Sequence, residues 1–135
     1  MDKVILKIHI MITDVKEVET NDAVIKMISF GGFCKSKCFK GKILDNAIDT
    51  QKIFADGTVE LSARYILEGT DYAKNDCRIF IENNVVCKNG EKIVTKPHIY
   101  TDSRQLQFLT NGEIYGEIVN EDKQLVILIK EGESE

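Results

Sequence analysis

Arg64 is the residue of this sequence whose type and placement most suggest chemistry. Alternation over 56–68 predicts a strand with one face formed by Glu60, Ser62, Arg64 and Glu68 and the other by Val59, Leu61, Ala63, Tyr65 and Leu67. Glu60 and Glu68 each lie about 13 Å from Arg64 along an extended strand, so neighbouring strands must supply its partners. Inside a barrel the guanidinium could hold a carboxylate, phosphate or enolate, whereas on an outer face it would be solvated. The sequence leaves both placements open.

Four further residues are candidates for the same site. Tyr65 alternates with Arg64, so the two can face one interior only if a β-bulge intervenes. Asn83 could orient a carbonyl or anionic group. His98 and Glu60 could carry a proton, although a general base needs a partner that sets its tautomer. The predicted ligand-binding residues are therefore Arg64, Tyr65, Asn83, Glu60 and His98, and no residue is assigned as catalytic.

Period-two alternation runs along the whole chain and indicates the elements that must position these residues. It predicts strands at 3–12, 22–30, 37–44, 48–55, 58–68, 75–83, 92–100, 104–110, 113–119 and 123–130. Turn-forming residues separate the segments, and Asp56-Gly57 and Asn111-Gly112 are the strongest signals for type I′ hairpins. Asp14, Gly31-Gly32 and Asn83-Asn84 are further predicted turns. No window has a sustained helical period.

Short strands linked by hairpins must hide their edges, and closure of the sheet into a barrel achieves this. We therefore predict an all-β fold, a single antiparallel lipocalin-like β-barrel over residues 1–135. Its meander would contain about 8–10 strands. A two-sheet sandwich is the alternative. The polar residues 131–135 are expected to form a frayed tail.

Composition and motifs argue against several classes of function. The 135 residues include 18 basic and 22 acidic side chains, a net charge of −4 without an electrostatic footprint for nucleic acid. Phosphate-loop, dinucleotide-binding, G-x-S-x-G and H-E-x-x-H motifs are absent, and no cofactor is predicted. Lys7 interrupts the N-terminal apolar run, which argues against a signal peptide and a membrane span. We expect a cytoplasmic protein.

The four cysteines are typical of a reducing compartment. Cys34 and Cys38 lie on one predicted strand, about 13 Å apart and too distant for a disulfide. A zinc site completed by Cys77 and Cys87 is the alternative, but the C-x3-C spacing differs from the compact C-x2-C knuckles of such sites. We expect reduced, mostly buried thiols and no metal.

Three stretches of the sequence together resemble one family. Gly31-Gly32 with Gly41-Lys42-Ile43-Leu44 is similar to a glycine-rich motif of that family, and 56–68 is similar to its D-G-x-x-x-L-x-A-R-Y-x-L-E core. The stretch 79–116 is similar to its closing hairpins. The family is the bacterial and fungal domain of unknown function 3237, or uncharacterised protein family 0311. The resemblance covers nearly the whole chain and implies a small antiparallel β-barrel, with no general activity assigned.

The chain also departs from the pattern of this family. Cys34 stands where the family usually has phenylalanine, Ser36 and Val85 stand where glycines are common, and Leu106 replaces an aromatic residue. Tyr100 stands where a glutamate is common. Any chemistry that depended on this glutamate elsewhere in the family would be lost here.

Three functions are compatible with these observations. The first is a barrel whose interior binds a partly apolar small molecule through Arg64 or Asn83, since barrels of this size leave room for one ligand. The second is a cofactor-independent isomerase or cyclase in which Arg64 stabilises an oxyanion and Glu60, Asp76 or His98 moves a proton. The third is a filled barrel that acts as an oligomeric interaction module. A homodimer formed through an edge strand or the apolar face of 4–12 is a further expectation.

Overall fold

A computed structural model describes residues 3–110 and 113–132 and confirms the all-β fold. Within these ranges it contains ten strands and one short 3-10 helix. The strands are β1 (Lys3–Glu19), β2 (Ala23–Lys35), β3 (Phe39–Ile43), β4 (Ile48–Phe54), β5 (Thr58–Asp71), β6 (Asp76–Lys88), β7 (Val94–Thr95), β8 (His98–Thr101), β9 (Ile114–Glu121) and β10 (Gln124–Glu131). The 3-10 helix, η1, is Gln107–Thr110. No helix in the described part of the chain is long and apolar enough to cross a membrane.

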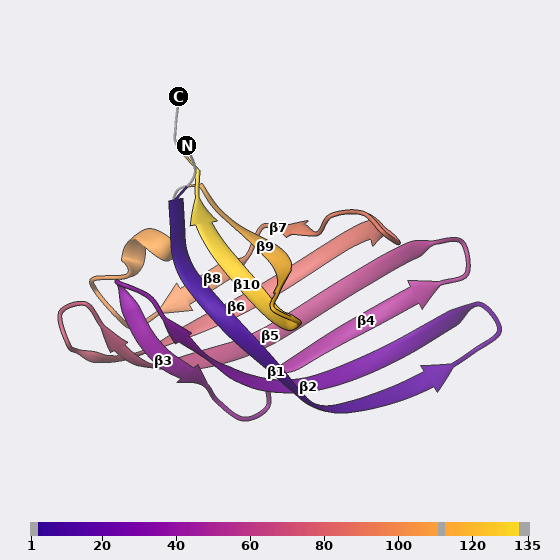
Figure 1. Cartoon of the computed structure of the whole chain (residues 1–135), viewed down its shortest axis with the longest axis horizontal. Coiled ribbons are helices and arrows are strands. Elements are labelled where there is room, and N and C mark those ends of the chain that lie inside the picture. Colours follow the sequence, from indigo (N-terminus) through magenta and orange to yellow (C-terminus); the bar gives the residue numbers. More distant parts are fainter. Residues whose placement is uncertain (1–2, 111–112, 133–135) are drawn as a thin grey trace.

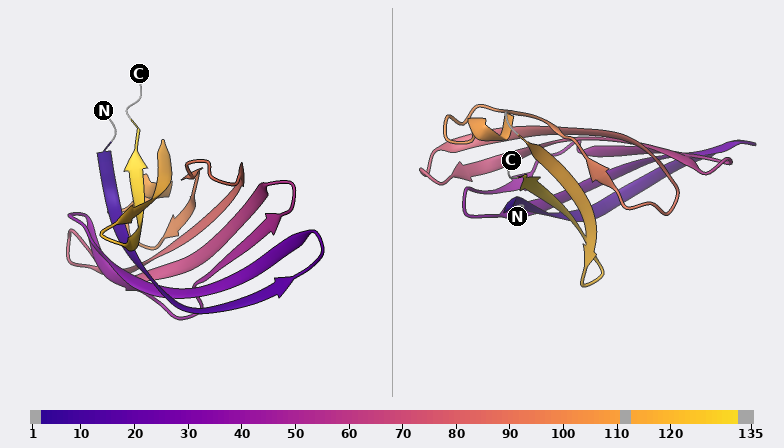
Figure 2. Two further views of the ribbon diagram at one scale, coloured as in Figure 1. Left: turned by 45° about the vertical axis from the view of Figure 1, so that its right-hand side comes forward. Right: turned by 90° about the horizontal axis from the view of Figure 1, so that it is seen from above.

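The strands form one antiparallel sheet that curls around a concave side (Figures 1 and 2). Its order is β7-β9-β10-β1-β2-β3-β5-β6-β8, and β4 pairs with β2 and β5. The long strands β2 and β5 therefore pair with β3 at one end and with β4 at the other. β7 and β8 lie at the two ends of this order, and only Lys96 and Pro97 separate them in the chain. The sheet is thus barrel-like, with its ends joined through the chain itself.

Several strands are longer than the sequence predicts, because residues expected in turns lie inside ladders. Asp14 follows a β-bulge in β1, where the register with β2 shifts between Ile12 and Asp14. Gly31 and Gly32 lie within β2, opposite Met11 and Ile10. Asn83 and Asn84 continue β6 opposite β5. A neighbouring strand takes up the backbone hydrogen bonds at each of these positions, so the local turn propensity does not decide the structure.

The predicted strand 92–100 is divided into two short strands, and the predicted strand 104–110 is wrong. Proline lacks the N–H that a ladder needs, and Pro97 separates the short strands β7 and β8. Residues 107–110 form η1, in which backbone bonds of 3-10 type bring Leu106 and Leu109 to the core. Asn111-Gly112 lies outside the described residues.

Two turns also differ from expectation. At Asp56-Gly57 only Gly57 has positive φ, at 92°, so this is not the predicted type I′ turn. The pair of positive φ values that type I′ requires occurs instead at Asp122 (51°) and Lys123 (65°), between β9 and β10. Each turn still connects two strands in the order that the sequence predicts.

Residues 131 and 132 of the expected frayed tail are held in place. Glu131 is the last residue of β10 and pairs with both Lys3 and Ile114. The amide of Gly132 donates a hydrogen bond to Glu113 O at 2.9 Å. Residues 133–135 lie outside the described residues. Two strands therefore hold the chain in place through position 132.

The buried core fills one half of the concave side. It is formed by aliphatic and aromatic side chains of β1, β2, β3, β5, β6, β8, β9, β10 and η1. Fully buried members include Leu6, Ile8, Leu67, Ile79 and Ile129. The strand β4 contributes none of these fully buried side chains, and its concave residues are only half-buried. The core therefore closes one end of the sheet and leaves space at the other.

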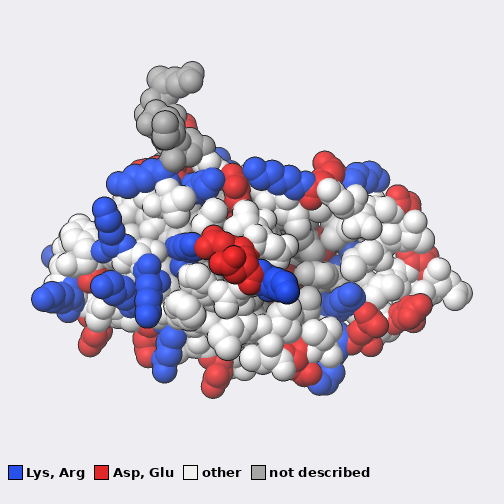
Figure 3. All heavy atoms as spheres, in the orientation of Figure 1, with Lys and Arg blue, Asp and Glu red and all other residues white. Residues whose placement is uncertain are grey.

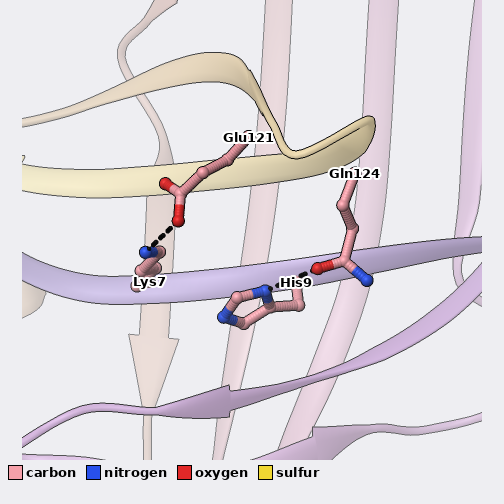
Figure 4. A network of polar contacts seen from close by, with 4 residues as sticks. All are labelled: Lys7, His9, Glu121 and Gln124. Carbon is pink, nitrogen blue, oxygen red and sulfur yellow. Dashed lines mark hydrogen bonds and ion pairs between the residues drawn. The ribbon is translucent and has the colours of Figure 1, made fainter.

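Polar contacts on the outer face tie β1 to the β9–β10 hairpin (Figure 4). Lys7 Nζ donates to Glu121 Oε1 at 2.6 Å, and His9 Nδ1 lies 3.0 Å from Gln124 Oε1. The ring of His9 also stacks on Phe33 of β2, with centroids 4.6 Å apart. These contacts hold the tip of the hairpin against β1, the strand with which β10 pairs.

Candidate functional site

A pocket of about 400 Å³ occupies the open half of the concave side. Its wall comes from the curled sheet on one side and from the β9–β10 hairpin and the segment before β7 on the other. The apolar lining residues are Ile10, Ile12, Ile28, Phe30, Leu61, Ala63, Val85, Ile93, Ile118, Leu125 and Ile127. The polar ones are Asp49, Gln51, Asn83, Glu91, Lys92, Thr95 and Asn120. The volume and the mainly apolar wall are typical of small-molecule sites.

Three adjacent strands place an aspartate, an alanine and an asparagine in one row on the pocket wall. Asp49 of β4 pairs with Ala63 of β5, and Ala63 pairs with Asn83 of β6. Residues directly opposite in an antiparallel pair share a face, with Cβ atoms about 5 Å apart. Alanine has no side chain beyond Cβ, so the two polar groups face a shared space above Ala63.

Asn83 carries a buried polar atom that lacks a partner. Its residue exposure is 8%, and its Oδ1 accepts no hydrogen bond from any group in the described part of the chain. A buried acceptor without a donor lowers stability by the cost of its desolvation, about 1–3 kcal/mol. A ligand N–H or O–H in the pocket would remove this cost.

Asp49 is the ionisable group on the pocket wall whose pKa is shifted. Burial raises the pKa of its carboxyl group, and the hydrogen bond from Gln51 Nε2 to Asp49 Oδ2, 2.9 Å long, opposes the rise. A carboxyl group with a raised pKa in a mainly apolar cavity can accept or donate a proton more readily than an exposed one near neutral pH.

The prediction that Arg64 could face the interior is wrong. Its neighbours Ala63 and Tyr65 point to the concave side, so Arg64 lies on the outer face, with 63% of its side chain exposed. Its Nε is 3.3 Å from Glu82 Oε2. His98 pairs with Glu82 in the β6–β8 ladder and therefore also lies on the outer face. The β-bulge needed to turn Arg64 and Tyr65 to one side does not occur in the regular β5–β6 register.

Glu60 also lies on the outer face. Alternation along β5 places it on the same face as Ser62 and Arg64. It pairs with Lys52 and Val86, beside a surface hollow that is also lined by Asn84. Of the five predicted site residues, the structure thus brings Asn83 to the pocket and places Arg64, Glu60 and His98 on the opposite side of the sheet.

Tyr65 belongs to the core next to the pocket. It is 2% exposed, and its ring packs edge-on against Phe30, with centroids 5.4 Å apart. Its hydroxyl is buried without a hydrogen-bond partner among the described residues, and burial raises the pKa of this phenol. The side chain therefore supports the inner end of the pocket, with a polar atom that the core does not satisfy.

Replacement of Tyr65 by phenylalanine is expected to raise the free energy of unfolding by about 1 kcal/mol, because it removes a buried hydroxyl without a partner. Equilibrium urea unfolding measures the change. Tyr100→Phe is the matched control, since that tyrosine is 66% exposed and its replacement should leave stability unchanged. A loss of stability in Tyr65→Phe would show that the hydroxyl has a partner in solution.

The four cysteines are free thiols in the structure. Cys34 and Cys38 do not share one strand as predicted, since Cys34 lies in β2 and Cys38 immediately precedes β3 across a tight turn. Burial raises the pKa of Cys38 to about 11 and also raises that of Cys34. Within residues 3–110 and 113–132, no group of three or more His, Cys, Asp or Glu side chains could hold a metal ion.

Lysines gather on the surface at the end of the molecule that carries β3 (Figure 3). Lys35, Lys37, Lys40 and Lys42 are exposed there, and Lys35 Nζ lies 5.8 Å from the ring centroid of Phe33. None of these lysines lines the pocket. The cation on its wall, Lys92, lies 3.7 Å from the carboxylate of Glu117. The lysine-rich end therefore supplies no charge to the candidate site.

Asp49 and Gln51, which lie near Asn83 on the pocket wall, are among the pocket residues that sequence reasoning missed. A signal for them was present, because the short Asp56-Gly57 turn sets the register of β4 against β5. That register pairs Gln51 with Leu61 and Asp49 with Ala63, on the apolar face of the 56–68 segment. The charged face of the same segment, which carries Arg64, points away from the pocket.

Three solved structures have a similar fold at low sequence identity. A protein of unknown function from Clostridium acetobutylicum is 21% identical over 98% of this chain and 99% of its own, with a TM-score of 0.81. A β-barrel-like protein from Acinetobacter baumannii is 18% identical, with coverage of 96% and 95% and a TM-score of 0.74. An enzyme from Penicillium herquei is 15% identical, with coverage of 97% and 94% and a TM-score of 0.74. At these identities the likeness concerns the fold.

A comparison with curated proteins gives no match. A family model described as protein of unknown function (DUF3237) matches residues 3–117, which include β1 to β8 and the first residues of β9. This match confirms the resemblance drawn from the glycine-rich motif and the 56–68 core. The chain therefore belongs to the DUF3237 family of proteins.

Proposed function

We propose that this protein binds a partly apolar small molecule in the concave pocket, with a hydrogen-bond donor of the ligand directed at Asn83. The observation that carries the proposal is the Oδ1 of Asn83, which has no hydrogen-bond partner among residues 3–110 and 113–132, in a pocket of about 400 Å³ with a mainly apolar wall. Ligand sites commonly combine apolar walls with a few convergent polar groups. Here the convergent groups are Asn83, Asp49 and Gln51.

A donor-bearing ligand fits this pocket better than the anionic ligand considered from the sequence. An anion would need a cation, but Arg64 lies across the sheet, and Lys92 lies beside the carboxylate of Glu117, which it shares with Lys130. The carboxyl group of Asp49 would repel an anion whenever it is ionised. A hydroxyl or amine group of the ligand could instead donate to Asn83 Oδ1 and to the carboxyl group of Asp49.

A thermal-shift screen with hydroxylated and amine-bearing metabolites tests the proposal on two variants of adjacent residues. Ala63→Leu fills the space between Asp49 and Asn83, whereas Arg64→Ala changes the outer face of the same strand. A ligand present at 100 times its Kd stabilises the native state by about 2.7 kcal/mol. Hits should raise the melting temperature of the wild type and of Arg64→Ala, but not that of Ala63→Leu.

The melting temperature of each variant without ligand shows whether it folds, and Asn83→Leu provides a second pocket variant in case Ala63→Leu unfolds. Loss of binding in Asn83→Leu with retention in Arg64→Ala would support the donor contact. Equal stabilisation of the wild type and Ala63→Leu by every hit would place the ligand elsewhere and overturn the proposal.

Proton transfer by Asp49 is the second candidate function. It is favoured by the raised pKa of this carboxyl group beside a polar group that could hold a substrate, and one structural neighbour is described as an enzyme. The reaction class would be a cofactor-independent isomerisation or cyclisation. Mass spectrometry and chromatography of each hit after incubation with the wild type distinguish a converted compound from one that is only bound.

A further inference from the structure

The strand β1 has a long free edge. It contains 17 residues, but β10 pairs only with Lys3–Ile10. From Met11 to Glu19, β1 pairs with β2 on one side, and no described strand pairs with its other side. The β1–β2 hairpin forms the margin of the sheet, with β1 as its outer strand and β4 beside β2 (Figures 1 and 2). Its outer strand therefore presents backbone N–H and C=O groups that can form a ladder with another strand.

The side chains along this edge include exposed apolar residues. Met11, Ile12, Val15 and Val18 are 47–62% exposed. Edge strands that avoid association usually carry lysines, inward charges or bulges. This edge has one bulge, but its charges have both signs, with Asp14 and Lys16 two residues apart and forming an ion pair along the strand.

The register with β2 assigns each side chain of the edge to one face of the sheet. Ile28 lines the pocket and pairs with Val15, so Val15 lies on the concave face. Asp14, Lys16 and Val18 then lie on the outer face. The bulge between Ile12 and Asp14 reverses the alternation, so Met11 shares the outer face with them.

This pattern is self-complementary in an antiparallel pair of two copies. A two-fold axis through Val15 places Val15 opposite its own copy, and Asp14 opposite Lys16 of the second copy, twice. With the bulge counted, it also places Met11 opposite Val18 and Ile12 opposite Glu17 of the second copy, each twice. Opposite charges and apolar pairs directly across a ladder are each favourable.

Two-fold registers centred on a charged residue of this segment, or on Val18, oppose like charges, and those centred on Met11 or Ile12 would need residues that already pair with β10. An axis through Asp14, Lys16 or Glu17 places that residue against itself. An axis through Val18 places Glu17 against Glu19. Like charges directly opposite each other destabilise a strand pair. Only the register centred on Val15 combines opposite charges with apolar contacts.

We propose that residues 11–19 of β1 pair antiparallel with the same residues of a second copy, in the register centred on Val15. The result is a closed two-fold dimer in which one sheet continues through both copies, since each chain uses the same surface. Ile12 belongs both to this segment and to the pocket wall, but the strand pairing uses backbone groups of β1 and does not require a ligand in the pocket.

Charge-swap variants test the register by sedimentation velocity over protein concentrations from about 1 to 200 µM, a range that detects dimers of moderate affinity. The wild type should be a dimer at the upper end. Lys16→Asp places two pairs of aspartates across the axis and should raise the dissociation constant at least about tenfold. The double variant Asp14→Lys/Lys16→Asp restores opposite charges and should restore the dimer.

Lys52→Asp is the matched control, because Lys52 is exposed on β4, which has a neighbour on each side and no free edge. It changes the net charge equally and should remain dimeric. The side chains of Asp14 and Lys16 are 52% and 78% exposed, so these substitutions should leave the fold intact, which far-ultraviolet circular dichroism checks. A monomeric wild type, a double variant that stays dissociated, or growth into species larger than dimers would each overturn the proposal.

Discussion

Replacement of Gly32 by alanine is expected to lower the free energy of unfolding by at least about 3 kcal/mol. A Cβ atom at this position would lie 1.8 Å from the carbonyl oxygen of His9 and 2.9 Å from its carbonyl carbon. Both are backbone atoms of the paired strand β1, so no side-chain rotation can relieve the contact. The φ angle of Gly32 is 142°, which is also unfavourable for any residue with a Cβ. Relief would require β1 and β2 to separate.

Gly31→Ala is the control that isolates this effect. Gly31 lies in the same strand, but a Cβ atom there would meet nothing within 4 Å, and its φ is not in the positive region. A glycine-to-alanine change at a compatible site stabilises a protein by about 0.4–1 kcal/mol through the unfolded chain. Urea unfolding of both variants should therefore give changes of opposite sign. Similar stabilities for the two variants would show that β1 and β2 do not approach each other closely in solution.

Gly31-Gly32 also illustrates how far sequence reasoning could describe the fold. Alternation and turn residues were sufficient to predict an all-β antiparallel chain, since each depends only on neighbours along the sequence. They could not predict that β2 continues through both glycines, because the reason lies in β1, more than twenty residues earlier. The local sequence likewise predicts a turn at Asn83, because the residue that pairs with it in the ladder, Ala63, lies twenty residues earlier in the chain.

The candidate site was predicted only in part, and the reason is geometric. Alternation divides the 56–68 segment into two faces, but it does not say which one faces inward when the interior contains a pocket. The charged face contains the side chains that could bind or react, including Arg64, so it was the face predicted to form the site. The structure shows instead that the apolar face encloses the pocket, so that Ala63 lies between the polar groups of Asp49 and Asn83. Ala63, which has no reactive group, therefore indicates the position of the site better than the adjacent Arg64.

Replacement of Asp71 by alanine is expected to lower the melting temperature by several degrees at pH 7. This carboxylate ends β5 and is 4% exposed. Its Oδ1 accepts hydrogen bonds from the amides of Ala73 (3.0 Å) and Asn75 (3.1 Å), and its Oδ2 accepts one from Ser103 Oγ (2.7 Å). Alanine would leave these three donors without their acceptor. Asp56→Ala is the control, because Asp56 caps an exposed turn through the single amide of Thr58 and should have a smaller effect.

The cost of Asp71→Ala should also depend on pH in a defined direction. The hydrogen bond from Ser103, followed by those from the backbone, lowers the pKa of Asp71 in the folded state. A carboxyl group with a lowered pKa stabilises the native state fully above its unfolded pKa, about 3.9, and loses this contribution as pH falls through the folded value. The difference in melting temperature between the wild type and Asp71→Ala should therefore be constant from pH 5 to 7 and should shrink below about pH 4.

A double-mutant cycle with Ser103→Ala separates the two parts of this contribution. Ser103 lies between β8 and η1, so its bond to Asp71 joins the β5–β6 turn to the segment that leads into the closing helix. Ser103→Ala removes this long-range bond and leaves the two turn amides paired with Asp71, so it should cost less than Asp71→Ala. It should also weaken the pH dependence, because Ser103 makes the largest contribution to the lowered pKa. Additive losses from the two substitutions would mean that the carboxylate and the hydroxyl do not interact in solution, and that the turn alone accounts for the effect of Asp71.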